Sequence, residues 1–177
     1  MQDRRQRFEA EVLVHLDAAY RFARWLAPAP GDADDLVQEA ALRAYRAFDD
    51  LRGPNAKAWL LTIVKNCHTS GQRARRDRYS VPLPQELEAM HEPALTAKDD
   101  PVEATLAADR ARLLSQALAA LPEDQRTILV LREIEDLDYR AIAQVIGIPL
   151  GTVMSRLARA RAALREHWSR LEAMPCP

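Results

Sequence analysis

Positively charged side chains gather in two separate blocks of this 177-residue chain. Residues 139–170 carry six arginines against one acid, a net charge of +5, and residues 51–79 carry seven bases against one acid, a net charge of +6. The whole chain has a net charge of −1, because the segments 32–50 and 80–105 are acidic, at −4 and −5. Since clustered basic side chains bind phosphate groups, the pattern indicates two polyanion-binding surfaces beside acidic surfaces with other partners.

The basic block near the C-terminus has the spacing of a helix with one apolar and one polar face. The apolar stripe spans about 60° of the helix circumference and consists of Val153, Leu157, Ala160 and Leu164. The opposite side carries Thr152, Ser155 and Arg159, with Arg156 on one flank and Arg161 and Arg165 on the other. Hydroxyl and guanidinium groups on an outer helix face are suited to phosphates and to the edges of DNA bases.

A short apolar helix over residues 139–145 and a glycine-containing break, "GIP", precede this basic helix. The small residue Ala143 lets two helices approach closely. A short helix, a tight turn and a second helix with a basic outer face predict a helix-turn-helix, whose second helix enters the major groove of DNA. An ordinary surface helix with solvated arginines would show the same local pattern, so further residues must decide.

The chain shows no arrangement typical of catalysis or metal binding, so no enzymatic activity, cofactor, metal or small-molecule substrate is expected. Its four histidines are scattered at His15, His68, His91 and His167. Cys67 and Cys176 are too far apart to indicate a disulfide framework; Cys67 is expected in the core, and a redox role for Cys176 stays open. The polar N-terminus and the absence of a long apolar run predict a cytoplasmic protein without membrane insertion.

Apolar residues at helical spacing predict an all-α fold in two parts. The first part contains helices over about 4–27, 33–48 and 55–70. Asp32 or Asp34 is the expected cap of the second helix, and Gly71 interrupts the third before a run of arginines. The segment 80–104 has four prolines and no clear period, which is typical of a linker. The expected domains are therefore residues 1–79 and 105–172, joined by this linker and followed by a tail at 173–177.

The stretch "LPEDQRTILVLREIEDLDYRAIAQVIGIPLGTVMSRLARARAALRE" resembles region 4 of extracytoplasmic-function (ECF) RNA polymerase sigma factors. The positions that match are Leu121, Pro122, Arg126, Leu131, Arg132, Tyr139, Ile142, Ala143, Gly151, Thr152, Val153, Ser155, Arg156, Leu157, Arg159, Ala160 and Arg161. Independently, "GDADDLVQEAALRAYRAFDDLRGPNAKAWLLTIVKN" is similar to region 2 of the same family. The two motifs stand in the family's order on either side of the acidic linker and cover about 150 of the 177 residues.

The resemblance implies a dissociable subunit of bacterial RNA polymerase that directs promoter-specific initiation of transcription. Region 4 would read the −35 duplex with the helix that begins near Leu150. The residues expected to contact it are Thr152, Ser155, Arg156, Arg159, Met154 and Arg161. Met154 could only make an apolar contact, for example with a thymine methyl group, and Arg161 could instead pair with the acids of "REIEDLD". Many members have a histidine or aromatic residue where this chain has Ala158, which puts a contact there in doubt.

Region 2 would capture a flipped base of the −10 element with the loop Leu51–Asn55 and the helix from Lys57 onward. The residues expected to contact it are Asn66, Thr62, Thr69, Arg73, Arg75 and Arg76. Trp59 is expected to pack in the core rather than to stack on a base. Asp35, Gln38 and Glu39 would dock on core polymerase, although acids also favour any helix start through the helix dipole.

The resemblance is to the short members of the sigma factor family, without the large N-terminal and middle regions of housekeeping sigma factors. This organisation also implies control by an anti-sigma factor that covers both the polymerase-binding and the DNA-binding faces. Two other classes stay open from the residues alone. A stand-alone helix-turn-helix regulator would bind duplex DNA without polymerase, whereas a sigma factor binds promoters tightly only with core polymerase. A helical adaptor that binds proteins alone would leave the two basic blocks unexplained.

Overall fold

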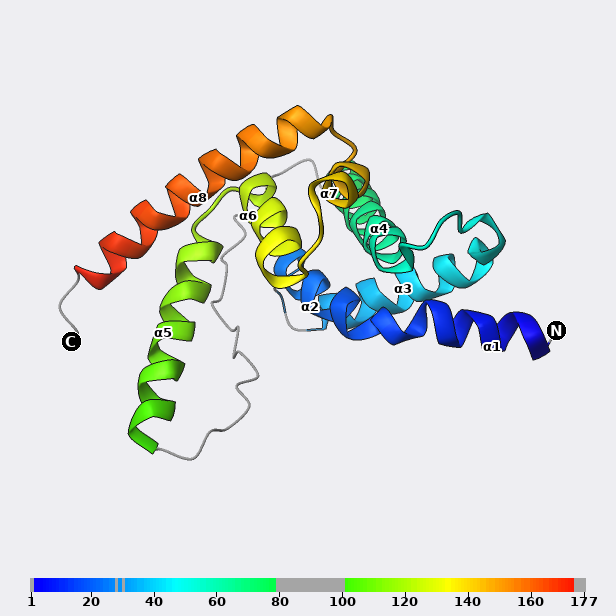
Figure 1. Ribbon diagram of the computed structural model, residues 1–177, viewed down its shortest axis with the longest axis horizontal. Coiled ribbons are helices and arrows are strands. Elements are labelled where there is room, and N and C mark those ends of the chain that lie inside the picture. The colour runs from blue at the N-terminus through cyan, green and yellow to red at the C-terminus, as the bar shows by residue number, and fades with distance from the viewer. Residues whose placement is uncertain (1, 28, 30, 79–100, 174–177) are drawn as a thin grey trace.

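The computed structural model describes residues 2–27, 29, 31–78 and 101–173, and every regular element in these ranges is a helix (Figure 1). The N-terminal half, residues 2–78, contains α1 (Gln2–Glu11), η1 (Leu13–His15), α2 (Leu16–Leu26), α3 (Asp32–Arg46), η2 (Phe48–Asp50) and α4 (Ala56–Arg78). The C-terminal half, residues 101–173, contains α5 (Pro101–Ala119), α6 (Glu123–Leu129), the π-helical turn η3 (Val130–Ile134), α7 (Tyr139–Ile146) and α8 (Leu150–Glu172). The predicted all-α class is confirmed. Most of the expected linker lies outside the described residues, but its last positions, 101–104, already belong to α5.

The single helix expected over residues 4–27 is broken, and this prediction was wrong. Between α1 and α2 the chain passes through the short turn η1, where Val12 is fully buried and Val14 is exposed. The break redirects α1 so that Phe8 packs edge-on against Tyr45 and Phe48, with ring centroids 5.1 and 5.3 Å apart. Tertiary packing of an aromatic side chain therefore overrides a continuous helical pattern.

The second and third helices begin and end differently from the prediction. Neither Asp32 nor Asp34 caps α3, because Gly31 occupies the cap position with a φ of 82°, which places both acids inside the first turn. At that position their charges still favour the helix dipole. Helix α4 continues through Gly71 to Arg78, since a glycine inside a helix costs only about 1 kcal/mol relative to alanine.

The C-terminal half forms the predicted helix-turn-helix. Helices α7 and α8 meet at 96°, within the range of this motif. The apolar stripe of α8 is buried as expected, because Val153, Leu157 and Ala160 are at most 1% exposed. They pack with Ile128 and Ile142 of the preceding helices.

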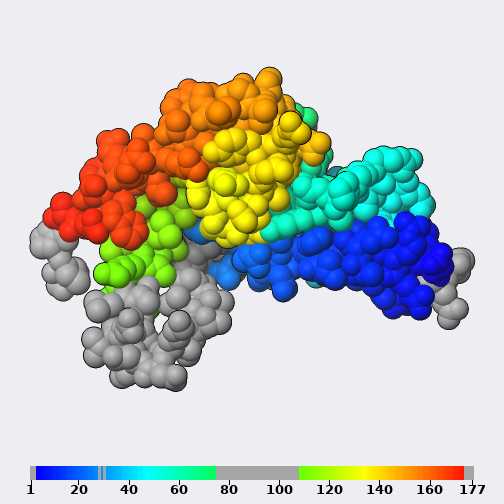
Figure 2. All heavy atoms as spheres, in the orientation of Figure 1, coloured from blue at the N-terminus to red at the C-terminus, as the bar shows by residue number. Residues whose placement is uncertain are grey.

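The two halves pack directly on each other rather than lying apart (Figures 1 and 2). One continuous cluster of buried residues includes Leu60 and Val64 of α4 together with Ile142 and Val145 of α7. We call the contact between the two halves the seam.

Among the described residues no single helix is long and apolar enough to cross a membrane; only the bent pair α7–α8 passes that test by length and composition.

Candidate promoter-DNA interface

The turn between α7 and α8 is held by the side-chain and backbone features that such a turn requires. The Asp138 carboxylate accepts a hydrogen bond of 2.7 Å from the Ala141 amide and so caps α7. Helix α7 ends at Ile146 and is capped by Gly147, whose φ of 78° is a left-handed conformation that glycine adopts without a steric penalty. Pro149 then precedes α8, which starts at Leu150. The chain therefore fixes the direction in which the start of α8 projects.

The polar residues predicted on the outer face of α8 lie there. Ser155 and Arg159 are exposed, and Thr152 is half-buried. Their contacts are local: the Ser155 hydroxyl donates to the Thr152 carbonyl at 3.1 Å, and Arg159 Nε donates to the Ser155 carbonyl at 3.4 Å. Arg159 has no acidic partner within the described part of the chain, so its guanidinium is available to an external anion.

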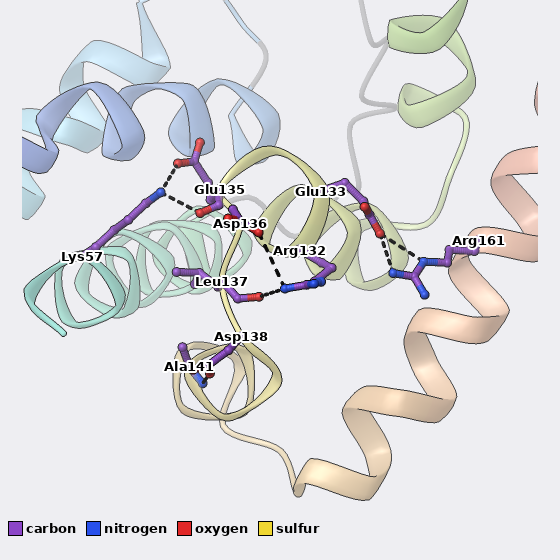
Figure 3. Close-up of polar contacts among 9 residues, drawn as sticks. All are labelled: Lys57, Arg132, Glu133, Glu135, Asp136, Leu137, Asp138, Ala141 and Arg161. Carbon is purple, nitrogen blue, oxygen red and sulfur yellow. Dashed lines mark hydrogen bonds and ion pairs between the residues drawn. The ribbon is translucent and has the colours of Figure 1, made fainter.

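Two other predicted −35 residues, Met154 and Arg161, lie in different environments from Ser155 and Arg159. Met154 is 55% exposed, with its thioether chain in solvent. Arg161 donates from Nη2 and Nε to one oxygen of Glu133, at 2.7 and 3.0 Å (Figure 3). The Glu133 carboxylate raises the pKa of Arg161 above its ordinary value. The structure thus agrees with the alternative in which Arg161 pairs with an acid of the stretch before α7.

In the N-terminal half, the loop before α4 is tied to the helix it precedes. The Asn55 side-chain oxygen accepts a hydrogen bond of 2.9 Å from the Ala58 amide, which caps α4. Gly53 has a φ of 84° at the tip of this loop. Trp59 is partly buried against the core, as predicted.

The predicted −10 residues are not equivalent. Asn66 is exposed and its amide has no hydrogen-bond partner in the described ranges. Thr62 and Thr69 donate their hydroxyl hydrogens to the carbonyls of Ala58 and Lys65, one turn earlier in the same helix. Arg73 is exposed, while the side chains of Arg75 and Arg76 fall outside what the structure describes.

The predicted polymerase-binding residues form an exposed face on α3. Asp35, Gln38 and Glu39 all face solvent, and Glu39 accepts a hydrogen bond of 2.6 Å from Arg43 Nε. Next to them, Leu42 is 54% exposed. A face that combines acids, an amide and an apolar side chain is suited to a basic protein partner.

The seam contains a charged residue that sequence reasoning missed. Glu135 follows η3, and its side chain has no exposed surface. Arg21 of α2 donates from Nε and Nη2 to both carboxylate oxygens, each at 3.0 Å. Lys57 of α4 lies 3.0 Å from the same carboxylate and donates to the Glu135 carbonyl at 2.6 Å (Figure 3). A buried carboxylate is stable only when paired in this way, so Glu135 ties the C-terminal half to both helices.

The backbone around Glu135 explains why neighbouring acids serve different contacts. Asp136 adopts a φ of 50°, and Arg132 Nη1 donates to the Leu137 carbonyl at 2.8 Å, which closes the turn after η3. The turn directs Glu133 toward α8 and Glu135 toward the N-terminal half (Figure 3). In the sequence these acids form one charge run that resembles a solvated loop, so no pattern distinguishes the buried one.

A second polar contact crosses the seam between α4 and α6. His68 Nε2 lies 3.4 Å from one oxygen of Glu123, and the Gln72 amide donates to the other at 3.2 Å. The hydrogen bond from His68 is the main reason that the pKa of Glu123 falls to about 2. Nearby, Lys65 Nζ donates to the Ile146 carbonyl at 3.3 Å.

The seam also contains an open pocket of about 490 Å³ that brings together residues predicted to bind separate DNA elements. Thr69, from the −10 set, lines it from α4, and Arg156, from the −35 set, lines it from α8. Leu26 and Ile148 provide apolar walls. Part of each predicted DNA-binding surface therefore faces the other half of the molecule.

Comparison with known proteins agrees with this two-part organisation. Residues 12–78 match the family model for Sigma-70 region 2, and residues 111–164 match that for Sigma-70, region 4. The ECF RNA polymerase sigma-E factor of Escherichia coli is 35% identical over 141 residues, which cover 76% of this chain and 72% of that protein. This chain belongs to the ECF sigma factor family. The RNA polymerase sigma-H factor of Pseudomonas aeruginosa is 39% identical over 137 residues, covering 75% and 71% of the two chains.

Two solved structures resemble this sigma factor over nearly its whole length. The sigma factor RpoE from Bartonella quintana, in complex with the anti-sigma factor NepR, has a TM-score of 0.74 and 30% identity, covering 95% of this chain and 98% of that one. CnrH, in complex with the cytosolic domain of CnrY, has a TM-score of 0.62 and 25% identity, covering 97% and 91%.

Proposed function

We propose that this sigma factor reads the −35 element with the start of α8 and the −10 element with the loop before α4 and the exposed side of α4, while α3 docks on core polymerase in the cytoplasm. The catalytic chemistry belongs to the polymerase. The observation that carries this assignment is the exposed Arg159, which has no acidic partner among the described residues, on the outer face of a helix-turn-helix. The amide of Asn66 on α4 is also exposed and has no hydrogen-bond partner among those residues.

We further propose that the closed arrangement is the resting state. The −35 and −10 elements are separate segments of the promoter, and each base pair between them adds about 3.4 Å. Thr69 and Arg156 line one pocket, so the two reading surfaces are far too close to engage both elements together. The halves must therefore separate on core polymerase. An anti-sigma factor would hold them together, and this proposal is supported by the likeness to RpoE and CnrH, whose structures each contain a second protein.

The test is run-off transcription with core polymerase and a pool of promoters from the source genome. The transcripts that appear only when the sigma factor is added to core polymerase are the ones that it selects. Asn66→Ala removes the amide expected to contact the −10 base and should lower initiation at least tenfold, because the site then loses a hydrogen-bonding group that a flipped base needs. Gln6→Ala deletes another exposed amide, on α1, and serves as the matched control.

The same reaction separates the rival class. A stand-alone helix-turn-helix regulator would bind duplex DNA tightly without polymerase and would not create new start sites. Failure to bind core polymerase, combined with specific binding to duplex DNA alone, would overturn the proposed function. Normal initiation by Asn66→Ala would overturn the assignment of the −10 surface.

A further inference from the structure

Helix α8 exposes apolar side chains beside its polar outer face. Leu150 is 43% exposed and Met154 is 55% exposed, although both are large hydrophobic residues. They stand one helical turn apart, and the exposed Ala158 follows one turn later. We call Leu150, Met154 and Ala158 the apolar row. None of the three contributes to the buried stripe of Val153, Leu157 and Ala160 that anchors the helix.

Single exposed apolar residues are common on protein surfaces and need no explanation. This row differs because of its position. It runs along the helix that the helix-turn-helix presents to DNA, beside Ser155 and Arg159 on the same exposed side. We call Ser155 and Arg159 the polar strip. A partner that covers the outer face of α8 therefore contacts the polar strip and the apolar row side by side.

We propose that the apolar row reads thymine methyl groups in the −35 element, and this proposal rests on the function proposed above. In the major groove, the C5-methyl of thymine is the apolar group on the base edges, whereas guanine offers acceptors that arginine binds. The polar strip is matched to guanine and phosphate oxygens, and the apolar row is matched to methyl groups. One DNA duplex then contacts both the polar strip and the apolar row.

The spacing of the row indicates how the thymines are arranged. Residues four apart on a helix are separated by about 6 Å along its axis. That distance corresponds to roughly two base-pair steps, at about 3.4 Å each. Leu150 and Met154 therefore contact methyl groups of different base pairs, on either strand. An A·T-containing segment next to a guanine-containing one is the expected −35 element.

The test removes the methyl groups without changing base pairing. Holoenzyme made with the full-length protein first selects promoters from templates with a randomised −35 region. Each thymine of the selected element is then replaced by deoxyuridine, and the affinity of holoenzyme for each template is measured by competition. Since burying one methyl-sized group corresponds to a factor of roughly three to four, each reading contact should lose about that much affinity on the uracil template.

The Met154→Ala variant links the effect to the apolar row. It should bind thymine and deoxyuridine templates equally at the position that Met154 contacts. Leu114→Ala is the matched control, because Leu114 is a comparable apolar residue, 41% exposed, on α5 of the same half. Leu114→Ala should keep the full preference of the wild type for thymine.

The outcomes distinguish failure of this inference from failure of the proposed function. Equal binding of the two templates by the wild type, a Met154→Ala variant that still prefers thymine, or selected elements without thymine would overturn the inference while initiation itself continues. If Met154→Ala weakened binding to core polymerase and left the thymine preference unchanged, the row would be a polymerase contact instead. Absence of any initiation with core polymerase is a different result, which would overturn the proposed function together with the inference that rests on it.

Discussion

At the scale of single residues, the arginines of α8 carry the same charge but occupy different environments. Arg159 is exposed without an acidic partner in the described ranges, whereas Arg161 is held by Glu133. Arg156 lines the seam pocket. The sequence leaves two roles open for Arg161, a contact with DNA or a pair with an acid of "REIEDLD", and the structure shows the pair with Glu133, 28 residues away.

Arg159→Ala should weaken promoter binding by holoenzyme about tenfold, since a lost bidentate base contact costs about 1–3 kcal/mol. Arg161→Ala should change it by less than about threefold, because an arginine already engaged in a partly exposed ion pair contributes little elsewhere. Titration of both variants with a fluorescent promoter fragment measures the difference. A larger loss for Arg161→Ala would show that the pair with Glu133 breaks on DNA.

At the scale of the elements, periodicity predicts where most helices lie and which face of α8 is buried. It does not predict the break at Val12–His15, because the cause is the distant contact of Phe8 with Phe48. It also does not predict that α4 passes through Gly71, since a glycine lowers helix stability without forbidding the helix. Local pattern is a weak guide wherever tertiary packing supplies more free energy than local preference.

Two glycines of the helix-turn-helix should respond in opposite directions to substitution by alanine. Gly147→Ala forces a side chain into a φ of 78° and should destabilise the protein by about 1–2 kcal/mol. Gly151 lies in α8 with open space around it, so Gly151→Ala should stabilise the helix by up to about 1 kcal/mol. Urea unfolding followed by circular dichroism tests both. Equal effects of the two substitutions would mean that the turn is not held in this conformation.

The contact between α4 and α6 should depend on pH through Glu123. Its folded-state pKa of about 2 lies below the ordinary 4.5, because the His68 hydrogen bond favours the carboxylate. A lowered carboxyl pKa adds stability that is full above about pH 4.5 and disappears as the pH falls toward 2. Unfolding of the wild type and of Glu123→Gln across this range should give a stability difference that shrinks with acid. A difference independent of pH would contradict the contact.

At the scale of the whole molecule, the closed arrangement combines the apolar cluster shared by α4 and α7 with long-range polar contacts that no sequence pattern predicts. Arg21 lies on α2, Lys57 on α4 and Glu135 in the turn after η3, and each residue type is ordinary for a surface. The two-domain organisation is predictable from the motifs. The way in which the domains face each other is not, because it depends on which acid of one short run is buried.

Replacing Glu135 should open the free protein. Glu135→Gln removes the charge that pairs two cations from the other half, and breaking a buried pair costs on the order of 3 kcal/mol. Glu133→Gln is the matched control two residues earlier, because Glu133 is half-exposed and pairs within its own half. Small-angle scattering should show a larger radius of gyration for Glu135→Gln alone. Unchanged compactness of that variant would exclude a role for Glu135 in keeping the two halves together.

The central claim is that this sigma factor is closed when free and separates its halves to read a promoter. One measurement tests it most directly: the distance between a label at Ser70 on α4 and a label at Ala162 on α8, both exposed positions, recorded by energy transfer in the free protein and then in a promoter-bound holoenzyme. The distance should increase, because the two elements are separate segments of the DNA and each base pair between them adds about 3.4 Å. An unchanged distance in a holoenzyme that initiates transcription would contradict the account.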